Sequence, residues 1–146
     1  MKVLLTILLI SSTLILSAQS LERSDYSIIL GDCFNRDTVS LSINNHAIFT
    51  NYTIENTDSL IKGNLSLTQY IQGIRINYNG KEKILKAIPV DYLLEIKVTV
   101  NRKINRFSLD MRKGNIILLD FCPEKVNQPA TRKLTASQLQ EPFLLM

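Results

Sequence analysis

Residues 74–80 read Ile-Arg-Ile-Asn-Tyr-Asn-Gly and decide the fold class of this chain. Apolar residues alternate with polar ones up to Tyr78, which is typical of a strand with one buried face. Asn79-Gly80 then favours a two-residue type I′ turn, because both central residues of that turn need a positive φ. A return strand runs from Lys83 to Ile88, and Pro89 ends it because proline lacks a ladder amide. This stretch therefore predicts a β-hairpin.

The same period of two continues on both sides of this hairpin, and no segment sustains a helical period. Tight turns separate the alternating segments at intervals of about ten residues. The pattern predicts an all-β fold, an antiparallel β-sandwich of immunoglobulin-like or C2-like type with eight or nine short strands. Antibody-type homology lacks support, because the chain contains no Trp. The other expected strands cover residues 26–30, 38–43, 47–54, 65–69, 94–100, 107–111 and 116–119.

Residues 1–20 have the features of an export signal. Met1-Lys2 precedes an uncharged apolar run from Val3 to Leu16, and small residues follow it. We therefore predict a signal peptide over residues 1–20, cleaved after Ala18 or after Ser20, and a secreted or periplasmic product with no transmembrane segment after cleavage. The alternative is an uncleaved membrane anchor, for which the apolar run is short.

The remaining chain is long enough for one domain with a single core. We expect the β-sandwich domain to cover residues 21–122. Residues 123–146 contain turn formers and little periodicity, which favours a loose C-terminal tail, with one or two helical turns open as an alternative from Thr135 to Gln140.

Two cysteines, Cys33 and Cys122, flank the patterned region. An oxidising compartment makes a disulfide the expected state of such a pair. A loop of this length would stabilise the fold by up to about 4.5 kcal/mol on the chain-entropy account. The alternative is two buried free thiols that act as small apolar side chains.

Charge gives a weak indication of partners. The net charge of the whole chain is +4, which is too small to predict nucleic-acid binding. Basic residues gather around two consecutive turns, where they form a candidate binding patch for an anionic group. The alternative is that these residues protect an exposed edge strand against aggregation. The candidate patch consists of Arg102, Lys103, Arg106, Arg112 and Lys113.

The sequence offers no catalytic or cofactor motif. It lacks a nucleophile elbow and a glycine-rich phosphate loop, and its one histidine, His46, falls in a predicted turn. A zinc site is poorly supported, because zinc would need more thiolate or imidazole ligands than two cysteines and one histidine provide. A calcium site is also poorly supported, because acidic loop residues are the only evidence for it. We therefore expect no enzyme, no cofactor and no metal. The acidic candidates are Asp32, Asp37 and Asp58 for calcium, and the pairs Asp91 with Glu95 and Asp110 with Asp120 for acid–base catalysis.

Short modification triplets also occur. Asn51-Tyr52-Thr53 and Asn64-Leu65-Ser66 match the N-glycosylation pattern. Asp37-Thr38-Val39 and Asp58-Ser59-Leu60 resemble the acceptor triplet for O-glycosylation in secreted Bacteroidota proteins.

The chain also resembles the small secreted β-sandwich proteins of Bacteroidota. The resemblance rests on Ser17-Ala18-Gln19 at the end of the signal, on Gly31-Asp32-Cys33-Phe34 and on the run from Asp37 to Leu41. It implies export and a β-sandwich, and it carries over no activity.

These observations favour a secreted or periplasmic, non-enzymatic binding module for a glycan or another envelope protein. The alternative is a structural or assembly component of the cell envelope. A glycan binder is expected to present an exposed aromatic platform, whereas an assembly component is expected to have a long unpaired edge or an apolar patch. The aromatic candidates are Phe34, Tyr52, Tyr70, Tyr78 and Tyr92.

Overall fold

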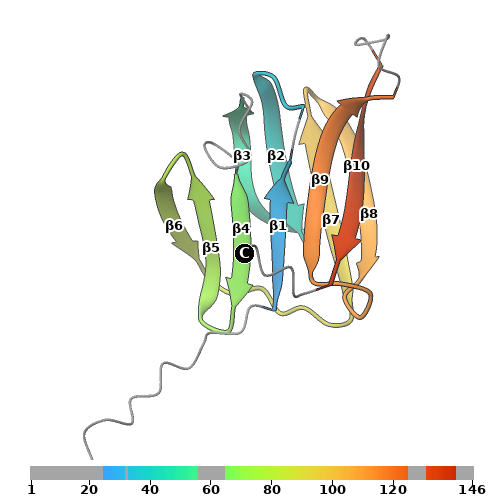
Figure 1. Ribbon diagram of the computed structural model, residues 1–146. Helices are drawn as coiled ribbons and strands as arrows, with labels where there is room; N and C mark the ends of the chain where they lie inside the picture. The colour runs from blue at the N-terminus through green and yellow to red at the C-terminus, as the bar shows by residue number, and fades with distance from the viewer. Residues whose placement is uncertain (1–24, 32, 56–64, 125–130, 141–146) are drawn as a thin grey trace, which may run out of the picture.

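The structure, a computed structural model, describes residues 25–31, 33–55, 65–124 and 131–140. Within these residues ten strands form two packed sheets (Figure 1). The predicted all-β sandwich is confirmed, with ten strands instead of eight or nine. The predicted signal peptide lies outside the described residues. The strands are β1 (Tyr26–Leu30), β2 (Asp37–Ile43), β3 (His46–Ile54), β4 (Ser66–Tyr70), β5 (Gly73–Tyr78), β6 (Lys81–Leu85), β7 (Leu93–Val100), β8 (Lys103–Asp110), β9 (Ile116–Pro123) and β10 (Arg132–Leu139).

The larger sheet has six strands in the order β10-β9-β1-β4-β5-β6, and the smaller sheet has four in the order β3-β2-β7-β8. All the pairs are antiparallel except β1 with β9, which run parallel. Alternate side chains of both sheets meet between them, and Tyr26, Ile28, Leu94 and Ile96 are among the fully buried ones. The period of two read from the sequence therefore corresponds to one buried face on most strands.

The Asn79-Gly80 turn has the predicted geometry. Asn79 has a φ of 50° and Gly80 a φ of 71°, and Tyr78 pairs directly with Lys81 across the turn. The return strand starts two residues earlier than predicted and ends at Leu85.

The expected loose tail is wrong for residues 132–139. They form β10, which pairs with β9 along its whole length. The prediction failed because only one large apolar side chain, Leu134, faces the core from this strand. The inward positions at its two ends hold polar residues, Arg132 and Gln138, which are satisfied by hydrogen bonds and not by apolar contacts.

The predicted disulfide joins Cys33, which follows β1, to Cys122 near the end of β9, with Cα atoms 5.0 Å apart. Beside it, the buried Phe34 ring packs against Phe121 at 5.9 Å between centroids. The covalent bond therefore ties the crossing from β1 to β2 onto the six-stranded sheet. Among the described residues no helix is long and apolar enough to cross a membrane.

Candidate functional site

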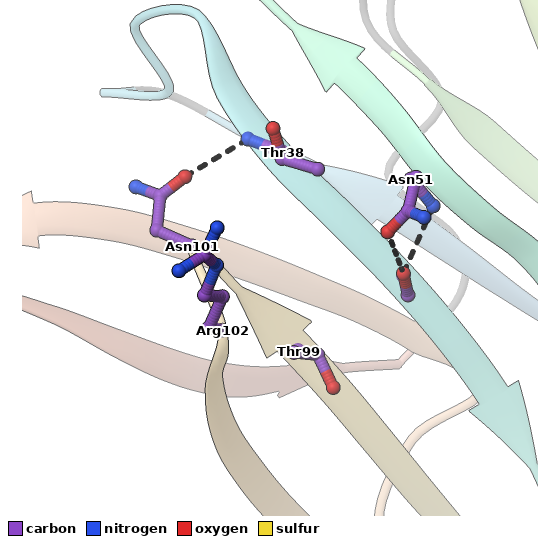
Figure 2. A pocket seen from close by; sticks show the side chains of 6 residues that line it. Thr38, Asn51, Thr99, Asn101 and Arg102 are labelled. Carbon is purple, nitrogen blue, oxygen red and sulfur yellow. Dashed lines mark hydrogen bonds between the residues drawn. The ribbon is translucent and has the colours of Figure 1, made fainter.

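A polar groove lies on the outward face of the four-stranded sheet, with a volume of about 620 Å³. Its lining comes from β2, β3, β7 and the turn after β7, so distant parts of the sequence meet there (Figure 2). The described residues that line it carry hydroxyl, amide or guanidinium side chains, and none of these described residues is a carboxylate, a histidine or a thiol. We call this surface the polar groove; its residues are Thr38, Ser40, Asn51, Thr99, Asn101 and Arg102.

A β-bulge between β2 and β3 aims Asn51 at the groove. The register moves from Val39 opposite Tyr52 to Leu41 opposite Phe49, so two residues of β3 face Ser40 alone. Asn51 adopts a φ of 57° at this bulge. The backbone amide of Asn51 donates to the Ser40 hydroxyl at 2.9 Å, and that hydroxyl donates to the side-chain oxygen Oδ1 of Asn51 at 3.4 Å. Bulges often re-aim a side chain at a functional surface, and this one holds an amide and a hydroxyl side by side.

The turn between β7 and β8 supplies the other end of the groove. Asn101 and Arg102 have φ values of 48° and 71°, the left-handed backbone of a type I′ turn. Asparagine tolerates this conformation, but arginine adopts it at a cost of about 1–2 kcal/mol, and glycine would remove that cost. Non-glycine residues held in this left-handed region concentrate at functional sites. The position of Arg102 in such a turn at the groove therefore makes the groove a candidate functional site.

Asn101 is fixed by two hydrogen bonds that connect the groove to a buried ion pair. The Thr38 amide donates to Asn101 Oδ1 at 3.0 Å, and Asn101 Nδ2 donates to Asp37 Oδ1 at 2.6 Å. Asp37 is only 3% exposed, and Arg132 of β10 donates to both of its carboxylate oxygens, at 2.5 and 3.0 Å. The Asn35 amide adds a bond of 2.7 Å. The groove is thus anchored to the opposite sheet through charged groups.

The pKa of Asp37 reflects both its burial and these hydrogen bonds. Burial raises the pKa of its carboxyl group, while the hydrogen bonds from Arg132, Asn35 and Asn101 lower it, and the net pKa lies below the ordinary value of 3.8. The guanidinium of Arg132 also lies 4.2 Å from the centroid of the Phe121 ring and donates to the carbonyl oxygens of Phe121 and Cys33. Asp37 is therefore a charged structural anchor and not an open calcium ligand.

The predicted basic patch is divided in two. Arg102 and Lys103 lie at one end of β8, and Arg112 and Lys113 follow its other end, roughly 23 Å away along an extended strand. Arg112 is engaged locally, since it donates to both oxygens of Asp110 and lowers the pKa of that carboxyl group to about 2. Arg106 lies between the two ends on the outward face, directly opposite Lys97 of β7. The candidate residues are therefore spread along β8, with Arg102 in the polar groove and Arg112 and Lys113 at the opposite end.

The aromatic candidates do not form one platform. Phe34 is buried in the core, and the half-buried Tyr52 and Tyr78 pack against each other at 5.6 Å. Tyr70 lies under the guanidinium of Arg75 at 5.0 Å. Tyr92 is 67% exposed, but it contacts Arg112 at the end of the sheet away from the groove. Any ligand of the groove must therefore be recognised by polar and charged groups.

The single histidine lies away from the groove. His46 is exposed at the start of β3, with Nδ1 2.9 Å from the carbonyl oxygen of Asn44. It borders a second, mainly apolar cleft of about 390 Å³ between β3 and residues 85–89. In the part of the chain that the structure describes, no three His, Cys, Asp or Glu side chains are grouped to hold a metal ion. Asp32, Asp58 and Asn64 lie outside the described residues.

No family model, no curated protein and no solved structure matches this chain. An immunoglobulin-like or C2-like relationship therefore stays a prediction.

Sequence reasoning missed Thr38, Ser40, Asn51, Thr99 and Asn101 as a group. The sequence did indicate the β2 part of the groove, because Ser and Thr occupy every outward position from Thr38 to Ser42. The pairing of β2 with β7 was not visible, since these strands are far apart in sequence. The bulge at Asn51 was not visible either, because it extends an otherwise ordinary alternating run.

Proposed function

We propose that this protein is a secreted or periplasmic, non-enzymatic binding module that holds a glycan in the polar groove. The observation that carries the proposal is the convergence of three hydroxyls, two amides and one guanidinium on one open surface. Sugar hydroxyls both donate and accept hydrogen bonds, so they match a lining that contains both kinds of group. The described lining residues include no carboxylate, histidine or thiol, which supports binding over hydrolysis, since hydrolysis needs an acid and a base or nucleophile.

The rigidity of the groove also supports a binding role. Asn51 is set by the bulge, and Asn101 is held between the Thr38 amide and Asp37. Polar groups that are already oriented lose less conformational freedom when a ligand arrives. The disulfide is compatible with a location outside the cytoplasm, and export itself is proposed from residues 1–20.

The test is a glycan array probed with the mature domain, followed by titration of any hit. Thr99→Val removes a groove hydroxyl and keeps a β-branched side chain, and Arg102→Gln removes the guanidinium. We expect each change to weaken binding about tenfold, because one lost hydrogen bond, or one lost charge-assisted bond, costs roughly 1–3 kcal/mol. The matched control is Thr135→Val on β10, an exposed threonine of the other sheet. Equal loss in the control, or no loss in the groove variants, would exclude the groove.

A second candidate function is an assembly component of the envelope, and the outer edge of β10 favours it. This edge pairs with no described strand, and its only charged residues are Arg132 and Lys133 at one end. An antiparallel pairing of two copies centred on Ala136 would set Lys133 opposite Leu139 and bring no like charges together. The other edges are protected, β6 and β8 by charged residues and β3 by its bulge.

Light scattering across a concentration series tests this alternative. A dimer that Ser137→Lys dissociates, and that the matched Ser108→Lys on β8 leaves intact, would support it. A wild-type monomer at several hundred micromolar would exclude pairing through β10.

A further inference from the structure

Two like charges face each other beside the polar groove. Lys97 of β7 and Arg106 of β8 are directly opposite in the antiparallel ladder, and both are exposed. Such a pair has its Cβ atoms about 5 Å apart. Thr99, a groove residue, lies two positions from Lys97 on the same face of β7, so the pair continues the groove at a distance of about 6.5–7 Å.

This arrangement is unfavourable in the free protein. Like charges directly opposite in a sheet destabilise it. Neither Lys97 nor Arg106 forms an ion pair with a described residue. Of the acidic groups on this face, Asp110 is bound to Arg112, and Glu95, two positions from Lys97 on the same face of β7, makes no ion pair with either cation.

Protection against aggregation does not explain both cations. Arg106 lies on β8, an edge strand, where a basic residue can block pairing with another chain. Lys97 lies on β7, an interior strand between β2 and β8, whose backbone is already paired on both sides. Protection of a free edge therefore does not account for Lys97.

We propose that the ligand of the polar groove is an acidic glycan, and that one of its carboxylate or sulfate groups binds between Lys97 and Arg106. The inference rests on the proposed function and names its ligand class. An anion between the two cations forms a favourable ion pair with each of them and so offsets their mutual repulsion. The guanidinium of Arg106 can also donate hydrogen bonds to two oxygens of the anion at once. Arg102 at the far side of the groove adds a third cation on the same surface. Charge then takes the place of aromatic stacking, since no aromatic residue is among the described residues that line the groove.

The experiment compares a hexamer of galacturonic acid with its methyl ester, which is the same sugar chain without the negative charges. A heparin-derived hexasaccharide tests sulfate as the source of charge. Binding to wild type, Lys97→Gln, Arg106→Gln and Thr99→Val is measured by calorimetry at 50 and 300 mM NaCl. Lys83→Gln, an exposed lysine of β6 in the other sheet, is the matched control.

We expect one acidic hexamer to bind at least tenfold more tightly than the ester, with affinity that falls at high salt. Lys97→Gln and Arg106→Gln should each weaken acidic binding about tenfold and leave binding of the ester unchanged. Lys97→Gln should also raise the Tm of the free protein by about 1–3 °C, because it removes the cross-strand repulsion. A gain in stability with a loss of binding is not expected of a purely structural lysine.

The outcomes separate the two proposals. Equal binding of the ester and both acids, lost in Thr99→Val but not in Lys97→Gln, would overturn the acidic class and keep the glycan groove. If an acidic saccharide binds, and its binding is lost in Lys97→Gln and Arg106→Gln but not in Thr99→Val, the anion site between the two cations would stand. The polar groove would then be overturned as the glycan site. Binding of none of the three saccharides would overturn both.

Discussion

Removal of the Asp37 carboxylate should be the most destabilising single change at the groove end of the molecule. Asp37→Ala deletes two bonds from Arg132, one from Asn101 and one from the Asn35 amide. It also leaves the charge of Arg132 without its partner while 22% of that side chain is exposed. Breaking a buried ion pair by removing one partner costs about 3–5 kcal/mol. Because Arg132 keeps some solvent contact and its carbonyl acceptors, we expect the lower end, about 3 kcal/mol.

Urea denaturation at pH 7 measures this loss, with the disulfide left oxidised in every sample. Glu55→Ala is the control, because Glu55 forms an exposed ion pair with Arg36. Exposed pairs contribute at most about 1 kcal/mol, so the control should change the unfolding free energy little. If Asp37→Ala costs no more than Glu55→Ala, the ion pair does not anchor the two sheets and the reasoning is wrong.

The same carboxylate gives a pH dependence of defined sign. Its pKa is lower in the folded state than in the unfolded state, so its stabilisation is fully present above the ordinary value of 3.8. That stabilisation is lost as the pH falls through the lowered pKa of the folded protein. Asp37→Asn should therefore reduce the acid sensitivity of the unfolding free energy below pH 4. An unchanged slope in this variant would show that other groups cause the acid sensitivity.

Three further predictions concern the turn, the disulfide and the histidine. Gly80→Val should lower the unfolding free energy by about 1–2 kcal/mol, because Gly80 has a φ of 71° that valine adopts only with strain. No atom lies within 4 Å of an added Cβ, so the cost is conformational and not a clash. A thermal melt that matches wild type would contradict this prediction. Replacing both Cys33 and Cys122 with serine should cost up to about 4.5 kcal/mol in denaturant unfolding, and two alkylated thiols in unreduced exported protein would show that the bond does not form. His46→Ala should change stability by less than about 0.5 kcal/mol and leave glycan binding intact; hydrolase turnover that this variant abolishes would make an enzyme the better account.

Local patterns predicted the fold well and the site poorly, for a physical reason. A strand such as β7 can be predicted from its alternation of apolar and polar residues. The turn at Asn79-Gly80 can be predicted because both residues tolerate the positive φ that a type I′ turn requires. The polar groove depends on which strands become neighbours, and the ladder of β2 with β7 joins residues about sixty positions apart. Neither the opposition of Lys97 to Arg106 nor the bulge at Asn51 can be found without that register. The strand β10 was missed because ion pairing and hydrogen bonds, and not an apolar stripe, hold its ends.

The most direct test of the polar groove as the binding site is an NMR titration of the ¹⁵N-labelled mature domain with the galacturonic acid hexamer. The account predicts that amide shifts concentrate at Thr38, Asn51, Lys97, Thr99 and Arg102 and that β10 stays unchanged. Shifts confined to the six-stranded sheet, or no shifts with this hexamer, its methyl ester or the heparin-derived hexasaccharide at millimolar concentration, would contradict it.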